Sequence, residues 1–214
     1  MRKAIGFSML CWILLVGYAH AEWFFDGYLG ATVTQENEPT LKALGETIDV
    51  DVNIDTAFTV GGRYGYYFAG LPWLGVGVDA SYWSTEITGR TVSPDLRGTA
   101  DLTVVPLSAL LFLRTGFFPE PEIPRGRLQP YLALGPALTF AILDAEGADD
   151  TEIRAGLDSR AGVGWRFNRN VGLFIEYRFF WTHPEWKDRL ENIDIAAEVD
   201  LSTHHVLTGV SLRW

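Results

Sequence analysis

The feature that most constrains the fold of this chain is a two-residue alternation of apolar and polar side chains, which recurs in about eight separate stretches. Such alternation is typical of a β-strand whose two faces meet different surroundings. Each stretch has ten or more residues, and turn-forming residues separate the stretches. They span residues 23–34, 56–68, 73–85, 102–115, 128–142, 155–167, 171–182 and 199–214. No run after residue 21 is apolar over the length of a membrane-spanning helix, so the pattern predicts an all-β chain.

The alternation is clearest in the second stretch. There Phe58 and Val60 share one face, and Arg63 lies on the other. The fifth stretch is ambiguous in phase because it contains Pro130 and Pro136, and proline cannot donate a hydrogen bond to a sheet ladder. Strands with one apolar face and one polar face, about ten residues long and repeated this often, indicate a transmembrane barrel.

The connections between the stretches differ in length. The connections at 69–72 and 168–170 are short, and the one at 116–127 is longer and contains three prolines. Long polar connections occupy about 35–55, 86–101, 143–154 and 183–198. Outer-membrane barrels have short periplasmic turns and long external loops. The pattern therefore predicts four external loops, with both chain ends on the periplasmic side.

Aromatic residues gather at both ends of the predicted strands, where rings prefer the membrane interfaces. The predicted periplasmic girdle contains Trp23, Phe24, Phe68, Trp73, Phe117, Trp165, Phe167 and Trp214. The predicted external girdle contains Phe58, Tyr82, Trp83, Phe140, Phe179 and Trp181. Two girdles are what a membrane-spanning barrel requires.

The first 21 residues have the pattern of a secretory signal peptide. A basic start at Arg2 and Lys3 precedes an apolar run at 9–16, and small residues flank a cleavage point before Glu22. We expect residues 22–214 to form one barrel domain without disulfides, because Cys11 is the only cysteine. The formal net charge of −10 makes nucleic acid an unsuitable partner.

Charged residues fall on the faces that alternation turns inward. They are Asp26, Arg63, Asp79, Arg114, Asp158, Arg160, Arg166, Glu176, Arg178 and Arg213. An arginine that faced lipid would cost about 2–4 kcal/mol at the membrane midplane. An eight-stranded interior is just wide enough for side chains, which favours a plugged lumen over an ion pathway.

Hairpin geometry predicts which of these charges are neighbours. If the second turn centres on Leu71, Arg63 lies opposite Asp79. Across the turn at 168–170, Arg160 falls beside Glu176, either directly or diagonally. Opposite charges at such spacing attract. We therefore expect these two pairs inside the lumen.

The chain resembles the small eight-stranded outer-membrane barrels of the OmpA, OmpX and opacity-protein type. The resemblance rests on the signal peptide, residues 23–30 (WFFDGYLG), residues 128–135 (LQPYLALG) and the terminal alternation that ends in Trp214. It implies an eight-stranded antiparallel up-and-down barrel in the bacterial outer membrane. It also implies that outer-membrane lipids and lipopolysaccharide are partners, and that the barrel-assembly machinery reads the aromatic end of the chain.

This resemblance leaves the finer function open. The first expectation is a non-enzymatic barrel, without cofactor, that contributes to envelope integrity or to surface interaction through its four loops. One alternative is a narrow solute or ion pore. Another is a lipid A-modifying enzyme, but the His-x-Ser-Asn signature of lipid A deacylases is absent: His183 is followed by proline and glutamate.

A hydrolase triad would need a serine, a histidine and an acid. Ser202 and His204 share one strand face, and His205 lies on the other. His183 is a further histidine, and Glu185 or Asp200 could orient the base. A serine and a histidine two residues apart are common by chance. We therefore expect polar rim residues here and no catalytic site.

The third long connection is acidic. It contains Asp144, Glu146, Asp149, Asp150 and Glu152. A calcium loop needs carboxylates at alternate positions around a central glycine, with a distal glutamate, and that spacing is missing. We expect a solvated surface that divalent ions bridge to lipopolysaccharide, and no specific metal site.

Overall fold

The computed structural model describes residues 21–34, 40–43, 46–49, 52–54, 56–90, 97–145, 148–182, 185–190, 193–198 and 201–214. Side chains are described within 21–34, 56–85, 102–142, 151–182 and 202–214. Residues 1–20 of the predicted signal peptide lie outside the described residues, as do His183 and Asp200. In the part of the chain that the structure describes, no helix is long and apolar enough to cross a membrane.

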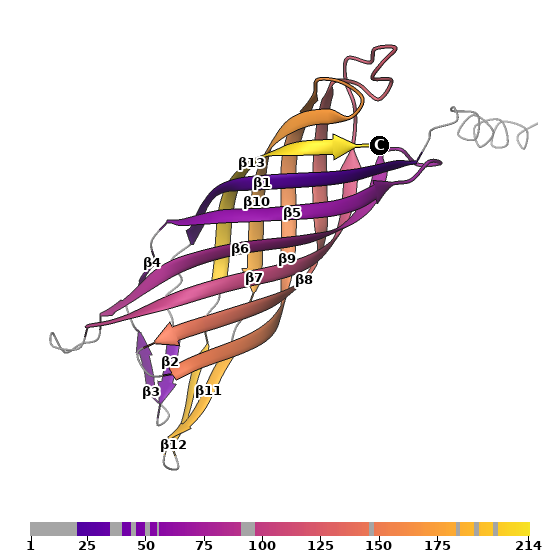
Figure 1. The fold of residues 1–214 in the computed structure, drawn as a ribbon. Helices are drawn as coiled ribbons and strands as arrows, with labels where there is room; N and C mark the ends of the chain where they lie inside the picture. The colour runs from indigo at the N-terminus through magenta and orange to yellow at the C-terminus, as the bar shows by residue number, and fades with distance from the viewer. Residues whose placement is uncertain are drawn as a thin grey trace, which may run out of the picture.

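Eight long antiparallel strands form a closed barrel (Figure 1). They are β1 (Glu22–Thr34), β5 (Ala57–Tyr67), β6 (Leu74–Arg90), β7 (Arg97–Arg114), β8 (Leu128–Ala145), β9 (Ala148–Arg166), β10 (Val171–Thr182) and β13 (Leu201–Arg213). Each strand pairs with its neighbours in the chain, β6 with β7 included. Pairing of β1 with β13 closes the barrel. The eight predicted strands and the predicted all-β barrel are therefore confirmed.

The predicted long loops contain further strands, which is a correction. The first and last long connections contribute β2 (Thr40–Ala43), β3 (Glu46–Asp49), β4 (Val52–Ile54), β11 (Glu185–Leu190) and β12 (Ile193–Glu198). Figure 1 shows β2, β3, β11 and β12 as a small sheet at one end of the barrel, and β4 pairs with β6. We call this end the external end, because long connections face outside in outer-membrane barrels. Hairpins β6–β7 and β8–β9 also continue into the predicted loops.

The inward and outward faces follow the predicted alternation. Phe58 is 63% exposed on the outer wall, whereas Arg63 is buried in the lumen. Strand β8 also alternates, with Pro136 on the outer wall. The β7–β8 ladder is interrupted beside this proline, between the pairs Ser108–Ala137 and Leu111–Leu134. This interruption is the expected result of a residue that lacks an N–H donor.

Two aromatic residues correct the predicted girdles. Phe24 and Trp83 are each 1% exposed and point into the lumen. Their chain neighbours Trp23 and Tyr82 occupy the outer wall instead. Nearness to a strand end placed all four residues at an interface, but strand phase decides which wall each one joins.

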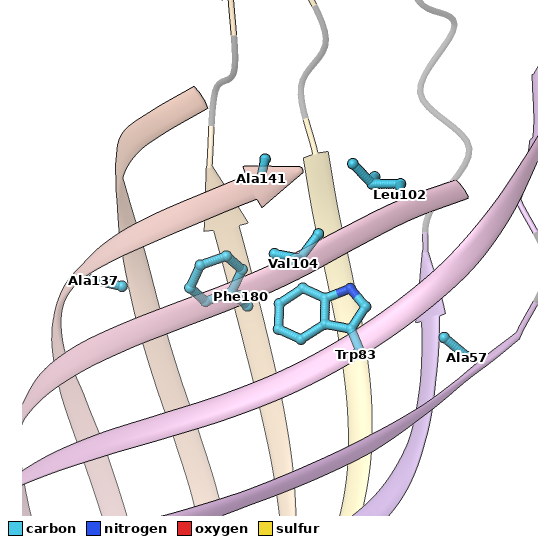
Figure 2. Close-up of a cluster of buried hydrophobic side chains, with 7 residues drawn as sticks. All are labelled: Ala57, Trp83, Leu102, Val104, Ala137, Ala141 and Phe180. Carbon is cyan, nitrogen blue, oxygen red and sulfur yellow. The ribbon is translucent and has the colours of Figure 1, made fainter. Parts of the chain in front are cut away.

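Apolar side chains fill the lumen on both sides of its middle. Near the external end, Trp83 packs edge-on against Phe180, with ring centres 5.7 Å apart. Figure 2 shows the full external layer, which consists of Ala57, Trp83, Leu102, Val104, Ala137, Ala141 and Phe180. A second layer toward the periplasmic end consists of Phe24, Tyr67, Leu110, Phe112 and Ala133. Charged residues lie between the two layers.

Candidate functional site in the barrel lumen

Seven charged side chains meet at mid-height in the lumen, and each is at most 3% exposed. We call them the central network: Asp26, Arg63, Asp79, Asp158, Arg160, Glu176 and Arg178. They project from β1, β5, β6, β9 and β10, so the network joins non-adjacent strands across the lumen. Buried charges require partners, because removal from water costs each ion several kcal/mol. Here those partners are one another.

Arg160 is the hub of the central network. One of its terminal nitrogens donates to Asp79 at 2.7 Å and to Asp158 at 2.8 Å. Its other terminal nitrogen donates to Glu176 at 3.3 Å. The predicted proximity of Arg160 and Glu176 is thus confirmed, in its diagonal form, because Gly162 is directly opposite Glu176.

Arg63 shows where the prediction was right and where it was wrong. Its predicted register opposite Asp79 is confirmed. Its ionic partners are instead Asp26, at 2.8 Å, and Glu176 on the far wall. Asp79 pairs with Arg160 and accepts a hydrogen bond from the Tyr28 hydroxyl at 2.9 Å. A long arginine can reach across an eight-stranded lumen, so its ionic partner need not be the residue directly opposite on the next strand.

Arg178 links the central network to the external apolar layer. Its guanidinium donates to Asp158 at 2.8 Å and to the Ser81 hydroxyl at 2.7 Å. It also lies over the ring of Phe180, 5.0 Å from the ring centre. Cation–π contacts of this kind strengthen when they are desolvated. Charge and aromatic packing therefore close the same section of the lumen.

A second group of charges, which we call the periplasmic cluster, surrounds Glu22. The Glu22 carboxylate accepts from Arg114 at 2.7 Å, Arg213 at 3.1 Å and Arg166 at 3.4 Å, and it also pairs with Arg125. Alternation had identified Arg114, Arg166 and Arg213 as lumen residues, but it had not identified Glu22 or Arg125. Glu22 has the same parity as Phe24 and Asp26, and that parity was the available signal.

The Glu120–Arg127 pair lies outside the spanning strands, on the turn between β7 and β8. The two side chains form a bidentate ion pair, with N–O distances of 2.6 and 2.7 Å. The hydrogen bond from Arg127 lowers the pKa of Glu120 below its ordinary value. This pair is open to solvent, which distinguishes it from the lumen charges.

The residues considered for a catalytic triad are distributed over both walls of the barrel. His205 is buried in the lumen, where its ring nitrogens contact the hydroxyls of Thr32 at 2.7 Å and Thr203 at 2.9 Å. His204 faces outward and lies 2.5 Å from the Tyr177 hydroxyl. Ser202 precedes both on the same strand, opposite Trp181.

The possible acid partners are not placed. Asp200 lies outside the described residues, and only the backbone of Glu185 is described, in β11. His204 and His205 point to opposite sides of the barrel wall, so their two rings cannot belong to one site. Within the described residues, no group of three His, Cys, Asp or Glu side chains could hold a metal ion.

Comparisons with known proteins agree with this architecture. The family model for the outer membrane protein beta-barrel domain matches residues 7–213. The solved structure of the outer membrane protein OprG from Pseudomonas aeruginosa is 14% identical, with a TM-score of 0.70, and the match covers 92% of this chain and 98% of that one. A search of curated proteins found no match.

Two further solved structures have the same fold. The outer membrane protein AlkL, studied in lipid bilayers, is 14% identical, with a TM-score of 0.60, and the match covers 93% of this chain and 92% of AlkL. Neisserial surface protein A is 15% identical, with a TM-score of 0.53, and the match covers 90% of this chain and 97% of that one. Since the family model spans nearly the whole chain, this protein belongs to the outer-membrane β-barrel domain family and resides in the bacterial outer membrane.

Proposed function

We propose that this protein is a non-enzymatic, non-conducting barrel that acts at the cell surface through its external strands and loops. The observation that carries the proposal is the filled lumen. At mid-height, the guanidinium of Arg160 bonds to three carboxylates on three different strands. Above it, Trp83 and Phe180 pack against each other. A solute would have to break both layers to pass.

The external end supports a surface role. Strands β2 and β3 come from the first long connection, and β11 and β12 come from the last. They pair in the order β11-β12-β2-β3, so two connections that are distant in sequence form one sheet. Backbone hydrogen bonds across such a sheet hold the connections in a defined arrangement, which suits recognition better than separate loops do.

The outer wall supports lipids as partners in this proposal, and the periplasmic end supports the assembly machinery as a partner. Large apolar side chains such as Leu132, Ile175 and Val206 are exposed there, as contact with lipid acyl chains requires. At the periplasmic end, the backbones of Trp214 and Trp23 exchange two hydrogen bonds. We propose that the barrel-assembly machinery reads this aromatic end before β1 and β13 pair. External lipopolysaccharide would then surround the acidic loops.

The surface role can be separated from a contribution to envelope integrity in cells. Three strains are compared: one without the protein, one with the wild type, and one in which residues 185–198 are replaced by a two-residue Asn-Gly turn. Permeability to a large antibiotic reports integrity, and adhesion to protein-coated surfaces reports surface contact. We expect the shortened barrel to restore the permeability barrier but not adhesion. Full restoration of adhesion would contradict the proposed role of the external sheet.

The enzyme alternative has a direct test. Mass spectrometry of lipid A from cells with and without the protein would reveal a lost or added acyl chain. We expect identical spectra. A mass difference that returns to normal with the wild type, but not with Ser202→Ala, would replace the proposal with a lipid A-modifying activity.

A further inference from the structure

A small cavity lies in the lumen between the central network and the periplasmic cluster. Four arginines, Arg63, Arg114, Arg166 and Arg213, are among the residues that line it, and so is Asp26. The cavity leaves about 20 Å³ for the centre of a water molecule. Nothing in the fold or in the proposed function assigns a role to this space.

The lining of the cavity has more positive than negative charge. Arg63 is neutralised by Asp26 and Glu176. The other three guanidiniums share the carboxylate of Glu22 as their ion-pair partner, and Asp26 also attracts Arg213. Their side chains are only 4–12% exposed, so water screens them poorly. Buried charges without full compensation are costly, and an anion in the cavity would supply the compensation.

One atom of the cavity lining, Oδ1 of Asp26, requires a hydrogen-bond donor and not an anion. Asp26 is 2% exposed, and its Oδ2 accepts from Arg63. Its Oδ1 is buried and has no hydrogen-bond partner among the described residues. An unsatisfied carboxylate oxygen needs a donor. A ligand that suits this cavity must therefore accept hydrogen bonds from arginines and also donate one to Asp26.

We propose that this cavity is a binding site for phosphate that carries a P–OH group, either as inorganic phosphate or as a monoester. At neutral pH inorganic phosphate is an anion that has several acceptor oxygens and retains at least one proton. A monoester, whose second pKa is about 6, retains a proton only in its monoanionic fraction. The arginines bind the acceptor oxygens, and the P–OH donates to Asp26 Oδ1. Sulfate and phosphodiesters have comparable acceptor oxygens but no proton at this pH, so the carboxylate repels them.

The size of the cavity is consistent with this ligand. A sphere that offers about 20 Å³ to water centres has walls about 3 Å from its middle, once the water radius is added. A tetrahedral oxyanion has about this outer radius. The site thus admits a single phosphate group and excludes a nucleotide base. A phosphate ester of a small alcohol would have to place the alcohol outside this space.

Titration of the folded wild-type barrel tests the proposal. The protein is held in neutral detergent without phosphate, and isothermal calorimetry follows the addition of inorganic phosphate, sulfate, glycerol 3-phosphate or dimethyl phosphate. We expect one phosphate per barrel, with sulfate weaker by on the order of tenfold, because the hydrogen bond to a charged group is lost. Glycerol 3-phosphate represents a monoester, and dimethyl phosphate represents the diester of a lipid headgroup. The monoester should bind more tightly near pH 6 than near pH 7.5, because its protonated monoanion is the bound form, and the diester should not bind.

Two variants and a matched control test the assignment of roles. Asp26→Asn presents an amide donor where the carboxylate was, so sulfate should bind as well as phosphate or better. Arg166→Gln should weaken both anions, whereas Arg154→Gln, which is on the same strand and pairs with Glu152 away from the cavity, should change neither. Heat-modifiable migration confirms that each variant is folded. Equal binding of sulfate and phosphate by the wild type would overturn the proposal, and so would a lack of saturable binding, which would mean that the cavity holds water alone.

Discussion

The two charge clusters of the lumen are built in opposite ways. In the central network, four carboxylates face three guanidiniums, and each guanidinium bonds to two or three charged or polar partners. In the periplasmic cluster, a single carboxylate, Glu22, serves Arg114, Arg125, Arg166 and Arg213. The central side chains are 0–3% exposed, whereas the periplasmic ones reach 21%.

This difference indicates what each cluster can tolerate. The central network is almost fully buried and nearly balanced in charge, so every member compensates another and any deletion removes a partner from at least one buried ion. The periplasmic cluster is partly exposed to solvent and contains more cations than anions, so it should tolerate the loss of one arginine. We therefore expect the same kind of substitution to have very different effects at the two places.

The largest effect should come from Arg160→Ala. This change leaves three carboxylates without their shared cation, and breaking a buried pair costs about 3–5 kcal/mol. Arg154→Ala is the matched control on the same strand and the same face, because Arg154 is 33% exposed and pairs with Glu152. Exposed pairs contribute about 0–1 kcal/mol. Urea unfolding in detergent would measure both, and equal losses would mean that water reaches the middle of the lumen.

The next largest effect should be a coupling free energy between two residues in contact. It should exceed the coupling between two residues that are only opposite each other in the strand register. Arg160 and Asp79 form an ion pair at 2.7 Å, whereas Arg63 lies opposite Asp79 but pairs elsewhere. A double-mutant cycle of alanine substitutions should give a coupling of about 1–3 kcal/mol for Arg160 with Asp79. The cycle for Arg63 with Asp79 should give less. The reverse order would show that hairpin neighbours, and not the contacts across the lumen, set the energetics.

In the periplasmic cluster, the two signs of charge should behave differently. Arg166→Gln should change the unfolding free energy by no more than about 1 kcal/mol, because other guanidiniums still neutralise Glu22 and repulsion among them falls. Glu22→Gln should cost more, about 1–3 kcal/mol, because a partly buried group that several donors share is lost. Unfolding at low and at moderate salt would measure both. If Arg166→Gln were the costlier change, the cluster would not have the surplus of cations that we describe.

The smallest effect belongs to the exposed Glu120–Arg127 pair. Because Arg127 lowers the pKa of Glu120 in the folded protein, the pair stabilises the fold above the ordinary carboxyl pKa, and this contribution disappears as the pH falls through the lowered value. Glu120→Gln should be slightly less stable than the wild type to urea at neutral pH. Between about pH 5 and pH 3, only the wild type should lose this small contribution. A larger loss of stability in the variant than in the wild type would mean that Arg127 does not lower the pKa of Glu120.

The strands and the inner wall could be predicted from the sequence because the evidence for them is local. Alternation alone placed Arg63, Glu176 and Arg178 in the lumen, and turn length alone set Arg63 opposite Asp79. Pairing across the lumen could not be predicted, because it depends on how the closed barrel brings β5 near β10. No short-range pattern encodes that distance.

Two other features were missed for identifiable reasons. Glu22 lies directly after the predicted cleavage point and just before the first alternating stretch, which begins at residue 23, although its parity with Asp26 points inward. The sequence predicts loops at the external strands β2, β3, β11 and β12, because each strand has only four to six residues, too few for a clear alternation signal. Their pairing depends on contacts between the first and the last long connection.

The most direct test of the central claim is the electrical conductance of the wild-type barrel in a planar lipid bilayer. If the central network and the Trp83–Phe180 layer fill the lumen, insertion of the folded protein should add no steady conductance in 1 M KCl at moderate voltage. Arg160→Ala, which opens the network, should add more current than Arg154→Ala. A stable, ohmic channel formed by the wild type would contradict the plugged lumen and favour a narrow pore.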